Sequence, residues 1–461
     1  MKNTIPLIAL LAFSAAAILT VISYLNILNI DPAVLLVVRW IAVAALIMFA
    51  VTKKSLTTWI LVSMVIGAEI GNDFPDFAIN LRVLSQVFLK LIKTIIAPLL
   101  FGTLVVGIAG HSDLKQVGRM GWKSLLYFEI VTTIALFVGL AAINISKAGV
   151  GINMPVSTTE ELPQVAKQST TDIILHVFPE NIAKSVAEGE VLQIVVFSVL
   201  FGVALAMISE KHRAPVLRFA EGLSEVMFKF TNIIMYFAPV GVGAAIAYTV
   251  GHMGLGILVN LFHLLATLYV ALIFFMLCVL LPIALIIRVP VKKFVQAIAE
   301  PVSIAFATTS SEAALPRAME AMVRIGVPPK IVAFVMPTGY SFNLDGTTLY
   351  LSLASVFVAQ AAGIDLTFGQ QILMVFTLML TSKGVAGVPR ASLVILLGTA
   401  ASFGLPVEPI FIILGIDELM DMAHTSVNVI GNCLATVVIA KWEGEFAKEP
   451  IESESIREVE V

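Results

Sequence analysis

The stretch PTGYSFNLDGTTLY, residues 337–350, decides how the rest of the chain is interpreted. It places Asn343, Asp345 and Thr347 around Gly346, in the middle of a chain that is apolar almost throughout. A carboxylate at bilayer depth, beside a glycine and two side chains that can coordinate a cation, is typical of a cation or substrate site. The stretch therefore indicates a membrane protein that transports a solute.

The composition of the whole chain supports this class. Hydrophobic residues make up 59% and charged residues only 13%, whereas a soluble globular protein carries roughly a quarter charged residues. The net charge of −3 offers no basic surface for a nucleic acid, and Cys278 and Cys433 lie in separate apolar segments. We therefore expect an all-α polytopic membrane protein with no disulfide framework, no cysteine metal cluster and no nucleic-acid partner.

Windows of about 20 apolar residues predict the membrane-spanning segments. They cover residues 5–25, 34–52, 55–71, 83–110, 121–146, 190–208, 215–250 and 257–288. The first could be a cleaved signal, but a retained helix is favoured because no polar domain follows it. Lysine and arginine gather at every second boundary, which predicts cytoplasmic loops there and an external segment at 147–189. The acidic tail, residues 446–461, is then cytoplasmic and disordered.

Two later segments do not read as simple spans. Residues 291–326 are flanked by basic residues on both sides and contain the turn TTSSEAALP at 308–316, so both ends are expected in the cytoplasm. Residues 366–404 repeat this arrangement from the outside, with the turn SKGVAGVPRAS at 382–392. Two interrupted segments in matching positions predict re-entrant hairpins of an inverted repeat, with a site at the membrane midplane. A pair of kinked ordinary helices is the alternative.

The last predicted helix carries a dense polar stripe. At about 100° per residue, six polar side chains fall within an arc of roughly 100°. They are Asp417, Asp421, His424, Thr425, Asn428 and Asn432. Hydrogen bonding between helices would explain the asparagines and the threonine, but two carboxylates and a histidine exceed what packing requires. The stripe as a unit is interpreted as functional, while Asp417 alone, nearer the outer end, could equally be structural.

Five ordered motifs resemble the dicarboxylate/amino acid:cation symporter family, which includes bacterial glutamate, aspartate and C4-dicarboxylate symporters and the excitatory amino acid transporters. The motifs are FLKLIKTIIAPLLF at 88–101, the turns at 308–316 and 382–392, NLDGT at 343–347, and DMAHTSVNVIGN at 421–432. The resemblance covers about residues 55–445. It implies a glutamate-transporter-like fold with eight core transmembrane helices and two re-entrant hairpins, assembled as a homotrimer that works by an elevator movement in the lipid bilayer.

The resemblance also implies a division of the chain into domains. Residues 55–120 and 147–250 would form the scaffold, with an extracellular loop in the second segment, and residues 121–146 and 251–445 would form the mobile transport domain. Residues 1–54 lie outside the family pattern and are interpreted as an added N-terminal transmembrane hairpin.

The substrate is placed by the resemblance between the tips of the two hairpins. Nine residues are implied to bind it: Ser310, Ser311, Thr347, Val388, Pro389, Asp421, His424, Thr425 and Asn428. The two serines and Asn428 match groups that hold the substrate's main-chain carboxylate. Asp421 matches the carboxylate that receives its ammonium group, which agrees with the need of a buried charge for a counter-charge.

One departure from the family pattern concerns substrate choice. Members that transport acidic substrates carry an arginine where this chain has His424, and an imidazole cannot copy the bidentate pairing of a guanidinium. Protonated His424 could still pair with a second carboxylate, which would favour glutamate or aspartate. Neutral His424 would instead favour a neutral amino acid. A C4-dicarboxylate is the third possibility, although it brings no ammonium group to Asp421.

A second departure concerns the coupling ion. Sodium-coupled members usually present an aspartate where this chain has Asn432, in a site with Gly339, Asn343 and Asn428. The amide lowers the charge of that possible sodium site, so protons are favoured over sodium. Asp345 and the carbonyl groups near Ser382 could still hold a cation.

A proton needs a carrier group. Glu129 lies six residues, or about 9 Å, past Lys123 in an apolar helix, where desolvation would favour its protonated form. A structural carboxylate bonded to Thr132 or Thr133 is an equal alternative for Glu129. Glu312, at the first hairpin tip, is a second candidate carrier.

Other classes of function fit less well. A channel would need a continuous polar pore, and an enzyme would need a nucleophile and base or a metal set, which the pair Asp421 and His424 does not supply. We expect a symporter rather than an enzyme, without a cofactor other than its coupling ion, H⁺ or Na⁺. A bacterial inner membrane is the expected location.

Overall fold

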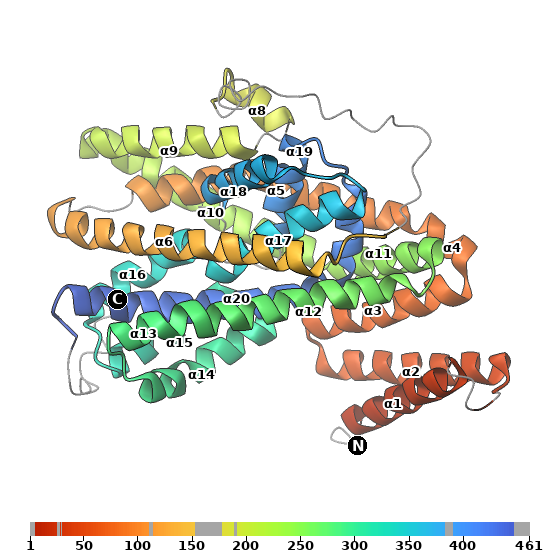
Figure 1. Cartoon of the computed structure of the whole chain (residues 1–461). Coiled ribbons are helices and arrows are strands. Elements are labelled where there is room, and N and C mark those ends of the chain that lie inside the picture. Colours follow the sequence, from red (N-terminus) through yellow and green to blue (C-terminus); the bar gives the residue numbers. More distant parts are fainter. Residues whose placement is uncertain are drawn as a thin grey trace. The chain divides into compact units, whose positions relative to one another are not determined.

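The computed structural model describes residues 5–24, 28, 30–109, 114–152, 178–188, 191–382 and 391–446, and every regular element in these ranges is a helix. Figure 1 shows their arrangement. The helices are α1 (Ile5–Tyr24), α2 (Pro32–Lys53), α3 (Leu56–Asp73), α4 (Pro75–Asn80), α5 (Arg82–Ala109), α6 (Leu114–Ser146), α8 (Ile182–Glu188), α9 (Val191–Met207), α10 (Glu210–Met235), α11 (Ala238–Met253), α12 (Ile257–Phe275), the π-helix η1 (Met276–Leu280), α13 (Leu281–Ile286), α14 (Val291–Thr308), α15 (Ser311–Arg324), α16 (Pro329–Phe342), α17 (Asp345–Ala361), α18 (Phe368–Thr381), α19 (Ala391–Ser402) and α20 (Glu408–Trp442). The predicted all-α class is confirmed.

Several helical stretches could cross a membrane by length and composition. Five stretches in the described ranges qualify on their own: Pro32–Lys53, Pro75–Val106, Met120–Ser146, Ile257–Ile286 and Glu408–Trp442. Helices α10 and α11 qualify together as a sixth, although they meet at a bend of 50°. The predicted single span at 215–250 is therefore broken, and Pro239 in the first turn of α11 supplies a reason, because proline lacks the N–H that would continue α10. The chain is a multi-pass membrane protein.

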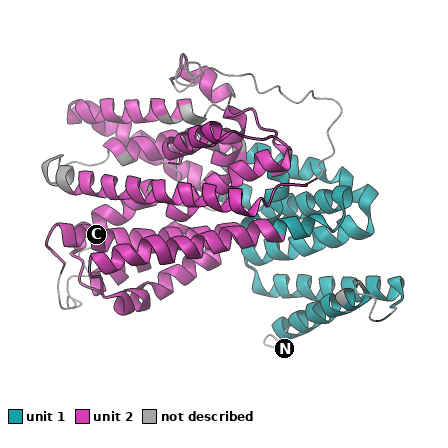
Figure 2. Cartoon of the chain, in the orientation of Figure 1, with its two compact units in different colours: residues 1–91, 232–261, 410–418 teal, residues 92–231, 262–409, 419–461 magenta. Residues whose placement is uncertain are grey.

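The described chain separates into two compact units, which Figure 2 colours differently. Unit 1 consists of residues 1–91, 232–261 and 410–418. Within it, α3 and α11 approach closely. Gly67 permits this approach, because a Cβ atom there would collide with the carbonyl oxygen of Gly243. Close contact through small residues is how membrane helices gain packing energy where no hydrophobic effect drives their association.

Unit 2 consists of residues 92–231, 262–409 and 419–461. Helix α17 is its most deeply buried element, with almost every side chain covered. It packs on α6, where Ser352 Oγ donates a hydrogen bond of 2.8 Å to the carbonyl oxygen of Leu136. Gly139 permits this contact, because a Cβ atom there would collide with the carbonyl oxygen of Leu349.

Three interruptions separate the helices of the C-terminal half of unit 2. Helices α14 and α15 meet at Thr309, which has a left-handed backbone with φ of 52°, and at Ser310, the N-cap residue of α15. The predicted turn at 308–316 is thus short, since α15 already begins at Ser311. Asn343 and Leu344 separate α16 from α17. Helix α18 ends before Ser382, and residues 383–390 of the second predicted turn lie outside the described residues.

Candidate functional site

The first part of the site is the break between α16 and α17, which brings the start of α17 against the middle of α20. Asp345 and Thr347 lie in the first turn of α17, with 0% and 4% of their surface exposed. Gly346 between them allows the approach, because a Cβ atom there would collide with the backbone carbonyl oxygen of His424. The glycine noted in the sequence is therefore required by a contact between two backbones.

Thr347 and two residues of the polar stripe on α20, His424 and Asn428, form one hydrogen-bonded group. The Thr347 N–H donates to Asn428 Oδ1 at 3.1 Å, and Asn428 Nδ2 donates to Thr347 Oγ1 at 2.8 Å. Thr347 Oγ1 also lies 3.3 Å from His424 Nδ1. Since this hydroxyl already accepts from Asn428, its own proton is available for Nδ1, which would place the remaining imidazole proton on Nε2.

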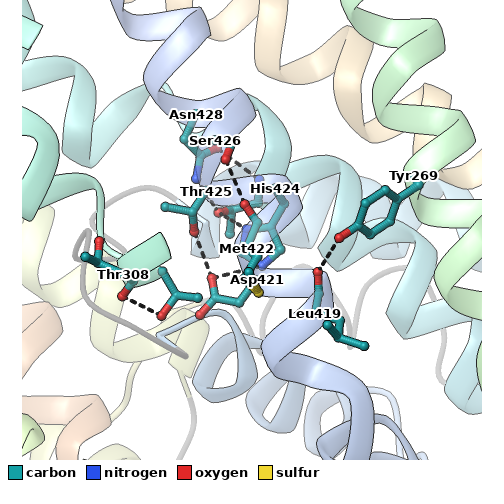
Figure 3. A network of polar contacts seen from close by, with 11 residues as sticks. Tyr269, Thr308, Leu419, Asp421, Met422, His424, Thr425, Ser426 and Asn428 are labelled. Atoms are coloured by element: carbon teal, nitrogen blue, oxygen red, sulfur yellow. Dashed lines mark hydrogen bonds and ion pairs between the residues drawn. The ribbon is translucent and has the colours of Figure 1, made fainter. Parts of the chain in front are cut away.

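Asp421 completes this group from the next turn of α20. Its Oδ1 accepts a hydrogen bond of 2.8 Å from Thr425 Oγ1 and lies 3.4 Å from His424 Nε2. The carboxylate and the imidazole are both 2% exposed. Figure 3 shows Asp421, His424, Thr425 and Asn428 converging along one side of α20. The arrangement can hold a cationic group at the carboxylate and an anionic group at the imidazole and amide.

A second group lies around the same break. Asn343 Nδ2 donates to Asp345 Oδ2 at 3.4 Å, and a Cβ atom on Gly431 would collide with that carboxylate. Gly339 lies against Asn432, since a Cβ atom on Gly339 would collide with Asn432 Oδ1. The structure thus brings the start of α17 and the end of α16 against α20, while a coupling ion at this group stays a prediction.

Several atoms of this second group have no hydrogen-bond partner among the described residues. They are Asn343 Oδ1 and both side-chain polar atoms of Asn432, and both side chains are 0% exposed. Leaving such atoms buried and unbonded costs about 1–3 kcal/mol each. Amide and carboxylate oxygens are ligands for hard cations, so the group has the chemistry of a cation site.

The remaining predicted substrate residues, and Ser382, lie at the two predicted hairpin turns. Ser310 caps α15, with its Oγ accepting from the Ala313 N–H at 3.3 Å, and Ser311 is 1% exposed. Ser382 is also buried, and its Oγ has no partner in the described part of the chain. Val388 and Pro389 lie outside the described residues. The placement of both hairpin tips beside Asp421 stays a prediction.

The two candidate proton carriers are half-buried. Glu129 lies on α6. Its neighbour Phe128 is close to Gly339, since the Phe128 ring lies 3.6 Å from where a Cβ atom on Gly339 would be. The hydroxyl of Thr132 donates to the Phe128 carbonyl oxygen at 2.7 Å. Glu312 lies in the first turn of α15. Their roles stay predictions.

Two tyrosines near the site were not predicted from the sequence. The Tyr350 ring packs on the His424 ring with centroids 4.9 Å apart, and helical spacing from Thr347 to Tyr350 could have revealed it. Tyr269 donates a hydrogen bond of 3.0 Å to the carbonyl oxygen of Leu419, 150 residues away. No sequence pattern could have indicated that bond, since any residue offers a carbonyl group.

Comparison with known proteins shows the family of this chain. A family model described as the sodium:dicarboxylate symporter family matches residues 56–442. The chain belongs to the sodium:dicarboxylate symporter family. The predicted limits of the resemblance are confirmed, as residues 1–55 lie outside the match. Because members of this family are symporters, the expectation of a transporter rather than an enzyme is also confirmed.

Three similar relatives carry different names. The proton/sodium-glutamate symport protein of Bacillus caldotenax is 43% identical over 86% of this chain and 96% of its own length. The proton/glutamate-aspartate symporter of Escherichia coli (strain K12) is 43% identical, covering 86% and 95%. The C4-dicarboxylate transport protein of Laribacter hongkongensis (strain HLHK9) is 40% identical, covering 87% and 92%.

Proposed function

We propose that this symporter takes up glutamate or aspartate together with a coupling cation. The observation that carries the proposal is the buried Asp421 carboxylate beside Thr425 and His424. A buried carboxylate requires a counter-charge, and the ammonium group of an amino acid supplies one. The names of relatives at 43% identity, which include glutamate and glutamate-aspartate, support the same substrate class.

The second carboxylate of an acidic amino acid would meet His424. Its imidazole lies between Thr347 and Asp421, with its ring packed against that of Tyr350 at a tilt of 30°. Protonation would let it form a charge-assisted hydrogen bond to the substrate. A neutral amino acid is the alternative if the imidazole stays neutral. Other relatives are named as C4-dicarboxylate transport proteins. A C4-dicarboxylate would leave Asp421 without a positive partner.

Protons are proposed as the coupling ion in preference to sodium. The buried group of Asn343, Asp345 and Asn432 has oxygen atoms that could hold a sodium ion, with Gly339 and Asn428 close by along α16 and α20. Asn432 nevertheless provides an uncharged amide where an aspartate would complete the usual set. Glu129, with Glu312 as the alternative, is the proposed proton carrier.

The finer architecture is proposed on the same basis. Helix pairs α14–α15 and α18–α19 would be the two re-entrant hairpins, joined by eight core helices, with residues 1–54 as an added pair. Residues 121–146 and 251–445 would form the transport domain, moving as an elevator against a scaffold in a homotrimer. A bacterial inner membrane, with the C-terminus in the cytoplasm, fits the distribution of lysine and arginine.

Uptake into proteoliposomes tests the proposal. Purified protein is reconstituted, and uptake of labelled glutamate, aspartate, succinate, serine and alanine is measured with proton and sodium gradients imposed separately. The proposal expects glutamate or aspartate uptake to exceed that of succinate and of the neutral amino acids. Preference for succinate would replace it by a C4-dicarboxylate symporter, and preference for serine or alanine by a neutral amino acid symporter.

A further inference from the structure

A cavity of about 400 Å³ lies in unit 2 on the side of α20 that faces away from the polar stripe. It is lined by α12 and the start of η1, by α14, and by Ala423, Ser426, Val427 and Ile430 of α20. These four residues follow the i, i+3, i+4, i+7 spacing of a single helical face, on average more than 100° from Asp421 and Asn428. The cavity and the proposed substrate site therefore share α20 as a wall.

The wall of the cavity offers no unused polar group. Its three polar side chains are all satisfied within the protein: Tyr269 donates to the Leu419 carbonyl oxygen at 3.0 Å, Ser303 to Ala299 at 2.7 Å, and Ser426 to Met422 at 2.8 Å. Figure 3 shows the bonds of Tyr269 and Ser426. A water molecule in a cavity needs two to four polar partners, so this space suits an apolar occupant. Its volume lies within the range of small-ligand sites.

The cavity lies beside the middle of an apolar stretch that is long enough to cross a membrane. The stretch α12, η1 and α13 spans residues 257–286, and Tyr269 to Met276 occupy its middle, about 18–29 Å from its start at 1.5 Å per residue. The side chains at the rim are apolar and open, with Ile273 49% and Phe306 42% exposed. The surface around the opening is thus continuous with the exposed apolar surface of these helices.

We propose that this cavity binds the acyl chain of a bilayer lipid, which supports α20 from behind the substrate site. An acyl chain supplies the dispersion contacts that an empty cavity would forfeit. Tyr269 connects the cavity to the proposed substrate site. It lines the cavity and donates a hydrogen bond to the carbonyl oxygen of Leu419, two residues before Asp421. Met276 at the cavity begins the π-helix η1, a type of irregularity that often marks functional positions.

Photolabelling tests the binding site without any transported substrate. Its result is therefore independent of the proposed function. The full chain is reconstituted in phosphatidylcholine vesicles containing a trace of phosphatidylcholine with a mid-chain diazirine, and adducts are mapped by mass spectrometry. Adducts are expected to concentrate on Met276, Val302 and Phe306. Ser303→Trp fills the cavity and should abolish this enrichment, whereas Val295→Trp, on the exposed surface of α14, should leave it intact. Ser303→Leu serves as a smaller filling variant with a lower risk of misfolding.

Hydrogen exchange tests the support of α20. In the wild type, amide exchange at Met420–His424 should slow when phosphatidylcholine vesicles replace a short-chain detergent. In Ser303→Trp the filled cavity should keep exchange slow in both media. Labelling spread evenly over lipid-facing residues such as Leu277 and unchanged by Ser303→Trp would overturn the binding site. Equal exchange of the wild type in both media would overturn the supporting role.

Discussion

At the scale of single residues, one carboxylate oxygen decides the chemistry of the site. Asp421 Oδ1 accepts a hydrogen bond from Thr425 and lies 3.4 Å from His424 Nε2. A substrate ammonium and a protonated imidazole would therefore compete for the same negative charge. Binding is expected to favour an amino acid whose second carboxylate draws the imidazole proton away from Asp421 toward the substrate.

The first prediction concerns Asp421. Asp421→Asn keeps the shape of the side chain and an acceptor for Thr425, but it removes the counter-charge of the ammonium group. We expect uptake to be lost, because an unpaired buried charge costs about 3–5 kcal/mol. Labelled-glutamate uptake in proteoliposomes measures this, with Asp365→Asn in an exposed loop as the control for the same loss of charge. Wild-type uptake by Asp421→Asn would remove this residue from the site.

The second prediction concerns His424 and pH. Free imidazole has a pKa of about 6.5, and a substrate carboxylate that faces the ring stabilises its protonated form, so binding takes up protons. Affinity for glutamate or aspartate should therefore strengthen as the pH falls from about 8 to 6. His424→Arg should bind these substrates more tightly, by about 1–3 kcal/mol, with little dependence on pH.

Equilibrium binding to detergent-solubilised protein is the appropriate measurement for His424, because transport rates also carry the pH dependence of proton coupling. The control ligands are serine and alanine, which have no second carboxylate. If the wild type binds them better than glutamate at every pH, and His424→Arg reverses that order, the neutral-substrate alternative is correct.

At the scale of elements, the added N-terminal helices are tied to α3 by charge. Arg39 of α2 forms ion pairs with Glu69, at 3.0 Å, and with Asp73. Trp40 Nε1 donates to the second oxygen of Asp73 at 2.9 Å. The two carboxylates are four residues apart and thus share one face of α3. Carboxylates inside a membrane helix need such partners, so α2 and α3 are expected to be mutually dependent.

The third prediction follows from this cluster. Arg39→Met should lower the midpoint of thermal unfolding in detergent, because removing one partner of a largely buried ion pair costs on the order of 2–4 kcal/mol. Lys53→Met, at the exposed end of α2, should have little effect. Deleting residues 1–54 should destabilise the protein in the same way, and adding Glu69→Gln with Asp73→Asn should restore most of the loss. A deletion that is stable without those changes would show that the cluster contributes nothing.

At the scale of the whole molecule, both polar groups of the site lie within unit 2, whereas α20 belongs to both units. Its residues 410–418 belong to unit 1, where the Arg82 guanidinium lies 5.3 Å from the ring centre of Tyr248 and 5.8 Å from that of Phe411. The rest of α20 carries Asp421 to Asn432. The helix that carries most of the proposed substrate site is thus also the helix that continues into the other unit.

The fourth prediction concerns energy coupling in the complete protein. An inward proton gradient should drive glutamate uptake without sodium, because Asn432 provides an amide and not a carboxylate in the proposed cation site. Glu129→Gln should abolish net uptake while sparing exchange of internal for external glutamate, since exchange needs no return of an empty, proton-free carrier. Glu312→Gln is the comparison that tells the two candidate carriers apart. Strict dependence on sodium, with no effect of a pH gradient, would refute proton coupling.

The sequence by itself determined the membrane class, the family and most of the helices. Hydrophobic windows and a polar stripe of period 3.6 are local patterns, so α1, α2 and the stripe on α20 were predictable within a few residues. The bend between α10 and α11 was missed, because a hydropathy window does not register a single proline such as Pro239.

Only the tertiary structure decided which side chains and backbones meet. The pairing of Thr347 with Asn428, the approach of Gly346 to the His424 backbone, and the bond from Tyr269 to Leu419 all join segments far apart in the chain. The cavity behind α20 depends in the same way on three packed helices. Such contacts depend on how closely helices pack and on which carbonyl group lies within reach. A single sequence encodes neither locally, because every residue carries the same backbone groups.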